Sequence, residues 1–181
     1  MKRKTEEEYK FIIEECKSLF RNKTKDYGTA WRVLRVPSIT DQIFIKAQRI
    51  RSVQEKGQQK IEENISCEFQ GIINYCLIAM MQIELENDSR MEIVYEDLEP
   101  LYDKFAQQTH KLLADKNHDY GEAWRDMRIS SITDIILMKL LRVKQIEDNQ
   151  GETIVSEGVI ANYQDMINYS VFSLIMLKNE N

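Results

Sequence analysis

Two pairs of basic residues stand in the middle of strongly apolar segments. Lys46 and Arg49 lie within the segment IFIKAQRI, and Lys139 and Arg142 lie within IILMKLLRV. Residues three apart share one face of a helix, and a charge enclosed there is costly unless an opposite charge meets it. We expect each pair to bind phosphate, because Arg offers a two-pronged fork and Lys a point charge. The alternatives are a carboxylate of the chain itself, or water reached by extended side chains.

Two acidic residues could complete such a site. The segments Glu68-Phe-Gln-Gly71 and Asn162-Tyr-Gln-Asp165 each keep one acid of a Glu-x-x-Asp pattern. Carboxylates three apart on a helix are good ligands for Mg²⁺, which takes one or two carboxylates together with phosphate oxygens and water. We therefore predict that Glu68 and Asp165 hold Mg²⁺ or orient a water molecule. The alternative is that they neutralise the two basic pairs.

A second set of candidates belongs to a repeated Asp-Tyr-Gly-x-Ala-Trp-Arg motif. Asp26 and Asp119 open its two copies, near helix C-termini, where the helix dipole favours cations over acids. We predict that these two acids also act at a metal ion or water; the alternatives are a hydrogen bond to the loop that carries the Trp, or pairing with an Arg. The aromatic residues of the motif could stack on a nucleobase or belong to the core, and they are Tyr27, Trp31, Tyr120 and Trp124.

All these residues occur in pairs because the chain repeats itself. From Asp26 to Arg49, 14 of 24 residues are identical to those 93 positions later. Further along, the offset becomes 94, which aligns Gln-x-x-Ile-Asn-Tyr at 70–75 with the same pattern at 164–169. We predict a first repeat at residues 1–90 and a second repeat at residues 91–181, forming one compact domain that imitates a homodimer within one chain.

Each repeat is predicted to fold as three helices. Apolar periodicity and capping signals place them at about 5–24, 38–55 and 59–86, and at about 100–117, 131–148 and 155–179. The two Ser-Ile-Thr-Asp segments, which end at Asp41 and Asp134, have the pattern of capping boxes. With only 6 Gly and 2 Pro, the chain has too few turn residues for a β-sandwich. The predicted fold class is all-α: a helical bundle of two tandem three-helix repeats related by a pseudo-two-fold axis.

Charge and hydropathy exclude several classes of protein. The net charge of −5 gives no overall field that would attract nucleic acid, so we do not expect non-specific nucleic-acid binding. The first residues lack the apolar stretch of a signal peptide, and the most apolar segment, 72–81, is too short to cross a bilayer. We expect a cytoplasmic protein with no membrane partner. A further homo-oligomer beyond the internal pseudodimer stays open.

The repeated Lys-x-x-Asp-Tyr-Gly-x-Ala-Trp-Arg motif, followed by Thr-Asp, Lys-x-x-Arg and Asn-Tyr, resembles the nucleotide modification associated domain family, first type, a domain of unknown function. The resemblance covers both repeats and implies an α-helical bacterial or phage domain associated with nucleotide or base modification. The family's third-helix Asp corresponds to Asp165, whereas the first repeat has Gly71 there. A more distant similarity is to all-α nucleoside triphosphate pyrophosphatases, which hold Mg²⁺ with Glu-x-x-Glu and Glu-x-x-Asp pairs; here Lys-x-x-Arg stands in place of the first pair.

These observations predict a nucleotide-handling protein whose ligand lies between the repeats. The basic pairs would hold phosphates, the four acids would hold Mg²⁺ or orient water, and Trp31 or Trp124 would take the base. If the protein is an enzyme, metal-assisted phosphoanhydride hydrolysis fits best, as in a Mg²⁺-dependent nucleotide pyrophosphohydrolase. The alternative is a non-catalytic nucleotide-binding or protein-interaction module. A purely structural role predicts a carboxylate within reach of every repeated cation, and no open pocket.

Overall fold

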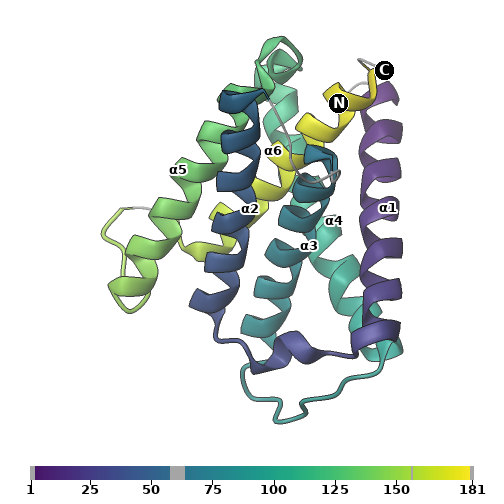
Figure 1. The fold of residues 1–181 in the computed structure, drawn as a ribbon, viewed down its shortest axis with the longest axis vertical. Helices are drawn as coiled ribbons and strands as arrows, with labels where there is room; N and C mark the ends of the chain where they lie inside the picture. Colours follow the sequence, from purple (N-terminus) through teal and green to yellow (C-terminus); the bar gives the residue numbers. More distant parts are fainter. Residues whose placement is uncertain (1–2, 58–63, 156, 180–181) are drawn as a thin grey trace.

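The computed structural model describes residues 3–57, 64–155 and 157–179, without the side chains of residues 3 and 117–120. Within these ranges all regular structure is helical and no strand is present, as the sequence predicts (Figure 1). Along the chain the helices are α1 (Arg3–Tyr27), the 3₁₀ helix η1 (Ala30–Val33), α2 (Val36–Lys56), α3 (Ile65–Glu84), α4 (Tyr95–Tyr120), the 3₁₀ helix η2 (Ala123–Asp126), α5 (Ile129–Asp148) and α6 (Val159–Asn179).

The six α-helices pair according to the repeat. Helix α2 packs against α5 and α3 packs against α6, while α1 and α4 contact each other as well as α3 and α6. Figure 1 shows the two members of each matched pair running in opposite directions along the long axis of the molecule. Two three-helix halves thus form one bundle, which confirms the predicted fold class.

Matched residues make matched contacts across the two repeats, as in a two-fold interface. Asp41 on α2 forms an ion pair with Lys144 on α5 at 2.5 Å. Its counterpart Asp134 on α5 pairs with Arg51 on α2 at 3.6 Å. The prediction that these two Asp residues cap their helices is therefore wrong, because each lies more than a turn inside its helix and faces the other repeat.

Several helices begin at other residues than predicted. Helices α2 and α5 begin two residues earlier than predicted, with Arg35 and Arg128 in extended conformation at the N-cap positions and no side-chain cap bond. Helix α3 begins at Ile65, where the Asn64 side chain accepts a hydrogen bond from the backbone of Ser66 at 3.3 Å. Residues 59–63 of its predicted range lie outside the described residues. Capping motifs alone were therefore an imprecise guide to these ends.

Helix α4 begins five residues before the predicted start at Pro100. Leu98 is fully buried in this added segment, so core packing extends the helix upstream of the proline. The C-terminal ends follow the prediction more closely, because Gly28 and Gly121 adopt the left-handed φ values of +60° and +65° just beyond α1 and α4.

The central helices α3 and α6 hold most of the core. Phe69, Leu77 and Met80 on α3 are fully buried, as are Met166 and Val171 on α6. Burial on most sides explains why these two helices are more uniformly apolar than the amphipathic outer ones. Their few polar residues are consequently conspicuous, because each requires a partner inside the molecule.

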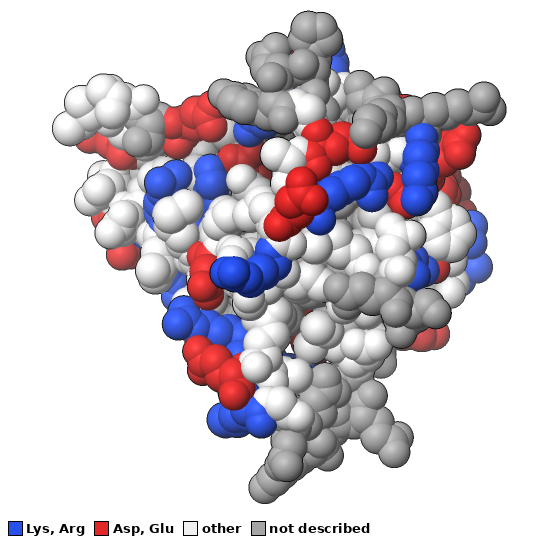
Figure 2. Space-filling model, turned by 90° about the horizontal axis from the view of Figure 1, so that it is seen from above, with Lys and Arg blue, Asp and Glu red and all other residues white. Residues whose placement is uncertain are grey.

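Acidic and basic side chains are intermixed on one face of the molecule. On the face seen in Figure 2, Lys and Arg side chains lie among Asp and Glu side chains, with white uncharged areas between them. None of the described helices combines the length and the apolarity needed to cross a membrane.

Candidate functional site

The basic pair of the first repeat meets an acid of the same repeat. Lys46 Nζ lies 3.2 Å from one carboxylate oxygen of Glu68, and Arg49 donates a hydrogen bond to the other. Glu68 stands at the start of α3 and is buried, whereas the two basic side chains are partly exposed. The pair therefore faces a carboxylate of the chain, which was the alternative to phosphate, and the binding of phosphate here stays a prediction.

The second repeat engages its third-helix acid differently. Asp165 on α6 accepts a hydrogen bond from Lys139 on α5 at 2.6 Å and another from Lys116 on α4 at 2.7 Å. Burial by itself raises the pKa of Asp165, but the two ammonium groups outweigh burial and hold that pKa below its ordinary value. The pairing of Lys139 with Asp165 therefore also places a carboxylate opposite a repeated cation.

Arg142 breaks this pattern. It is exposed and forms no ion pair within the described ranges, because the position that matches Glu68 is Asn162. Arg142 and Lys139 border an open hollow of about 750 Å³ beside the turn that follows α5. Two acids, Glu152 and Glu157, border the same hollow, so its charge is mixed.

Gly71 stands where the second repeat has Asp165, and the difference changes the position of the lysine. A Cβ atom at residue 71 would lie 2.8 Å from Cδ and Cε of Lys46, so the lysine side chain lies directly across the backbone of Gly71. The Lys46 ammonium group lies 5.8 Å from the ring centre of Tyr75 and pairs with Glu68. A glycine at this position is what allows Lys46 to approach α3 so closely.

A cavity of about 610 Å³ opens beside Lys46, and its lining comes entirely from the first repeat. This volume is typical of small-molecule sites. Apolar side chains from α1, η1 and α3 form most of the wall, and Lys23, Lys46 and Glu68 supply its charged groups. The cavity therefore does not lie between the repeats, where the sequence analysis placed the ligand and where the apolar faces of α3 and α6 pack together.

The two matched tryptophans occupy different environments. Trp31 in η1 is half-buried and lines the cavity, and no aromatic ring of the described residues stacks on it. Trp124 in η2 is buried and stacks on Phe172 with ring centres 4.2 Å apart and an angle of 4° between the planes. The first-repeat counterpart of Phe172 is Ile78, which also lines the cavity. In the second repeat the ring of Phe172 therefore lies beside the tryptophan, at the position where the first repeat has the smaller Ile78.

The other motif residues are only partly described. Tyr27 borders the cavity and exposes 72% of its surface, whereas Asp26 is exposed and makes no described side-chain contact. The side chains of Asp119 and Tyr120 lie outside the described residues, so their predicted roles stay predictions. Of the predicted ligand-binding residues, the cavity brings together Tyr27, Trp31 and Lys46, with the acid Glu68.

The predicted metal ligands are occupied by cations of the chain. Both oxygens of Glu68 accept hydrogen bonds from Lys46 and Arg49, and both oxygens of Asp165 accept them from lysines. Among the described residues no group of three or more Asp, Glu, His and Cys side chains is arranged to hold a metal ion. A Mg²⁺ ion at Glu68 would therefore lie next to the positive charges of Lys46 and Arg49, which disfavours its binding.

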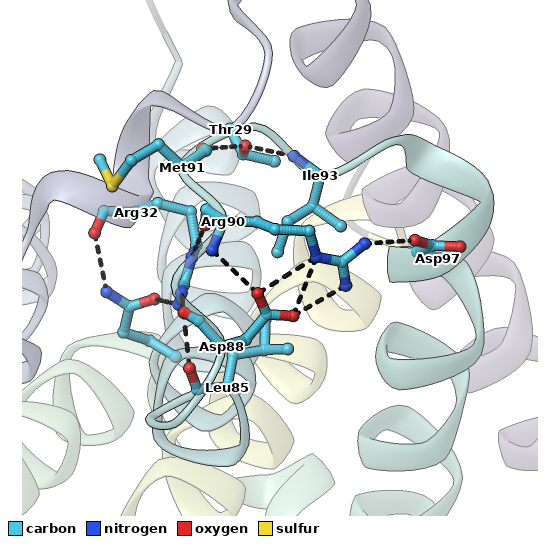
Figure 3. Close-up of polar contacts among 9 residues, drawn as sticks. Thr29, Arg32, Leu85, Asp88, Arg90, Met91, Ile93 and Asp97 are labelled. Atoms are coloured by element: carbon cyan, nitrogen blue, oxygen red, sulfur yellow. Dashed lines mark hydrogen bonds and ion pairs between the residues drawn. The ribbon is translucent and has the colours of Figure 1, made fainter.

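One arginine of the motif has a structural role next to the site. Arg32 points into the turn that joins the repeats and donates hydrogen bonds to the backbone oxygens of Leu85, Asp88 and Arg90 (Figure 3). It also bonds the side chain of Gln82. Thr29, just before η1, accepts a hydrogen bond from the Ile93 backbone at 3.0 Å and so secures the other end of the connection. The loop that carries Trp31 is thus fixed to the segment between α3 and α4.

Sequence reasoning overlooked two lysines of this arrangement. Lys23 borders the cavity, and its counterpart Lys116 bonds Asp165. Their identity at the offset of 93 was visible in the sequence, but both lie on polar helix faces where lysine is common. The stronger signal was the set of positions at which the repeats differ, namely Gly71 against Asp165 and Ile78 against Phe172.

Comparison with protein families agrees with the internal repeat. Residues 23–83 and residues 116–177 each match the family described as nucleotide modification associated domain 1, a domain of unknown function. The search of curated proteins and the search of solved structures found no match. Each matched segment runs from the end of the first helix of a repeat almost to the end of its third helix.

Proposed function

The chain belongs to the nucleotide modification associated domain 1 family, and from this premise we propose that it binds a nucleotide in the cavity of its first repeat. The observation that carries the proposal is the composition of the cavity wall. Aromatic side chains border the cavity together with two lysines. A nucleotide presents the complementary groups, a planar base and an anionic phosphate.

The aromatic side of the cavity suits a base. Trp31 has no ring partner among the described residues, and Tyr27 and Tyr75 border the same space. An aromatic face in an otherwise apolar pocket stacks on any base, because every base has a π-face. The matched Trp124 already has such a partner in Phe172. Binding is therefore expected in the first repeat and not in the second.

The cationic side suits a phosphate. Lys46 shares Glu68 with Arg49, and Lys23 forms no ion pair within the described part of the chain. A phosphate would compete with Glu68 for Lys46 and would give Lys23 a partner. The open cavity distinguishes this proposal from a purely structural role, which predicts paired cations and no pocket.

The test uses Trp31 as a reporter. The chain has 2 tryptophans, so the variant Trp124→Phe leaves Trp31 as the sole indole and keeps an aromatic ring against Phe172. Nucleoside mono-, di- and triphosphates of each base would be titrated with and without Mg²⁺, following Trp31 fluorescence and, by chromatography, any product. We expect saturable binding of at least one nucleotide. Product formation that requires Mg²⁺ would add the hydrolytic function to the binding function.

Matched lysine variants supply the control. Lys23→Ala should weaken binding about tenfold, as expected for losing one charge-assisted contact. Lys116→Ala removes the matched lysine of the second repeat and should leave the affinity unchanged. The proposal fails if no nucleotide changes the fluorescence of Trp31 or the melting temperature of the unmodified chain.

A further inference from the structure

The second repeat carries within its own chain the two chemical groups that the first repeat lacks. Asp165 places a carboxylate between Lys116 and Lys139, at 2.7 Å and 2.6 Å. Phe172, two helical turns further along α6, places a ring on Trp124. A carboxylate and an aromatic ring on one helix together occupy the space beside a lysine pair and a tryptophan.

The first repeat has the matching two lysines and tryptophan, but it has neither the carboxylate nor the second aromatic ring. Lys23 and Lys46 match Lys116 and Lys139, and Trp31 matches Trp124. The three first-repeat residues, Lys23, Lys46 and Trp31, line the cavity. The carboxylate and the ring are missing because Gly71 and Ile78 stand at the positions of Asp165 and Phe172. Gly71 and Ile78 also line the cavity.

We infer that Asp165 and Phe172 stand in the second repeat where a ligand binds in the first repeat, and that this ligand is a nucleoside monophosphate. Its phosphate takes the place of the Asp165 carboxylate, between Lys23 and Lys46, and its base takes the place of the Phe172 ring on Trp31. This inference rests on the proposed function and makes its ligand specific.

The number of phosphates follows from the charges. The Asp165 carboxylate is a single anionic group held by two ammonium groups. The matched place in the first repeat offers two lysines, one of which already shares Glu68. A phosphate monoester, which carries close to two negative charges at neutral pH, satisfies two lysines. A triphosphate would bring further charge together with its metal ion, and Glu68 would repel the additional phosphates.

The Lys46 side chain has to change position when the phosphate binds. In the structure it lies across Gly71, in space that a Cβ atom could not share. In the second repeat Lys139 leaves that position to Asp165 and bonds the carboxylate. The ligand phosphate is expected to draw Lys46 away from Glu68 in the same way, and Arg49 then stays as a partner of Glu68.

The decisive variants convert the first repeat into the second, one position at a time. Gly71→Asp should fill the phosphate place and weaken the binding of nucleoside monophosphates at least tenfold, while unphosphorylated nucleosides keep their affinity. Gly71→Asn, which has the same shape without the charge, should have a smaller effect. Ile78→Phe should weaken the binding of nucleosides and of nucleoside monophosphates alike. Each affinity would be measured by calorimetry and by Trp31 fluorescence in the Trp124→Phe background.

The outcomes separate this inference from the proposed function. If nucleotides bind but Gly71→Asp leaves their affinity unchanged, or if triphosphates bind at least tenfold more tightly than monophosphates, the inference is overturned and the nucleotide-binding function stands. If inorganic phosphate binds, and Gly71→Asp abolishes that binding while no nucleotide binds, the place for an anion is supported but the nucleotide function is overturned. Because Gly71→Asp reproduces a pairing already present in the second repeat, circular dichroism should show an unchanged fold.

Discussion

Tyr102 on α4 donates a hydrogen bond to the side-chain oxygen of Asn74 on α3 at 2.9 Å, across the boundary between the repeats. Its counterpart Tyr9 on α1 makes the same bond to Asn168 on α6, also at 2.9 Å. Each Asn in turn donates to a backbone oxygen of its own repeat, Asn74 to Cys16 and Asn168 to Thr109. The two buried amides therefore connect three helices each, and they explain why an Asn-Tyr pair recurs on two apolar helices.

These paired bonds should be costly to break. Tyr102→Phe removes the hydroxyl and leaves the Asn74 oxygen buried with no donor, which costs about 1–3 kcal/mol of unfolding free energy. Tyr9→Phe should cost a similar amount because its geometry is equivalent. Urea denaturation would measure both losses. Tyr27→Phe, at a largely exposed hydroxyl, is the control and should change stability by less than about 0.5 kcal/mol. Equal stability of all three variants would contradict this role.

The repeat made the fold predictable. Three helices per repeat and their pairing followed from apolar periodicity and from the identity of the two copies, since one copy buries little core by itself and pairing enlarges that core. The helix starts were less predictable, because packing of residues such as Leu98 outweighs capping signals. Asp41 and Asp134 illustrate the same limit, since their role depends on a partner helix that sequence reasoning did not place opposite them.

The candidate site was only half predictable, for a physical reason. Positions shared by both copies, such as Lys46 and Lys139, identified candidate side chains but could not show that a cavity lies beside Lys46. Gly71 and Ile78 line that cavity, and both are smaller than the residues at the matched positions of the second repeat. A cavity forms where side chains are too small to fill the available space. The positions at which the copies differ in side-chain size are therefore the informative ones.

The two tryptophans should differ in their contribution to stability. Trp124→Ala removes a buried ring from its stack on Phe172 and should cost about 3–5 kcal/mol, in the range for large core truncations. Trp31→Ala should cost distinctly less, because Trp31 is half-buried and borders an open cavity. Guanidinium unfolding of the two variants compares the same change at matched positions. Losses of equal size would mean that the first-repeat cavity is closed in solution.

Glu147 on α5 should make stability fall as pH rises. It is half-buried and accepts hydrogen bonds from Thr40 at 2.7 Å and Tyr163 at 3.3 Å. Burial raises the pKa of Glu147 above its ordinary value, so the folded protein holds this proton more strongly than the unfolded chain does. Its contribution is therefore complete below the unfolded pKa and is lost as pH rises through the folded pKa.

The first repeat supplies the substitution that tests this behaviour. Gln54 stands at the matched position and donates to Thr133 at 3.1 Å. Glu147→Gln should therefore remove the contribution of Glu147 to the pH dependence and leave the protein at neutral pH as stable as before, or slightly more stable. Unfolding curves between pH 4 and pH 8 would show the stabilities of Glu147→Gln and of the unmodified chain diverging above the pKa of Glu147. A loss of more than about 1 kcal/mol at neutral pH would mean that the charged carboxylate is needed.

Arg32 should control the mobility of the connection between the repeats. Its guanidinium group donates hydrogen bonds to the backbone oxygens of Leu85, Asp88 and Arg90 (Figure 3). The single ammonium group of a lysine cannot reproduce these three bonds. Both Arg32→Ala and Arg32→Lys should therefore increase hydrogen exchange and protease cleavage at residues 85–93 while the helices keep their protection.

Arg35→Ala is the matched control, because Arg35 is exposed and its side chain makes no described contact. Loosening of the connection should also move the η1 loop and weaken nucleotide binding in the Arg32 variants alone. If exchange at 85–93 is the same in the Arg32 and Arg35 variants, the connection is held by Thr29 and its neighbours instead.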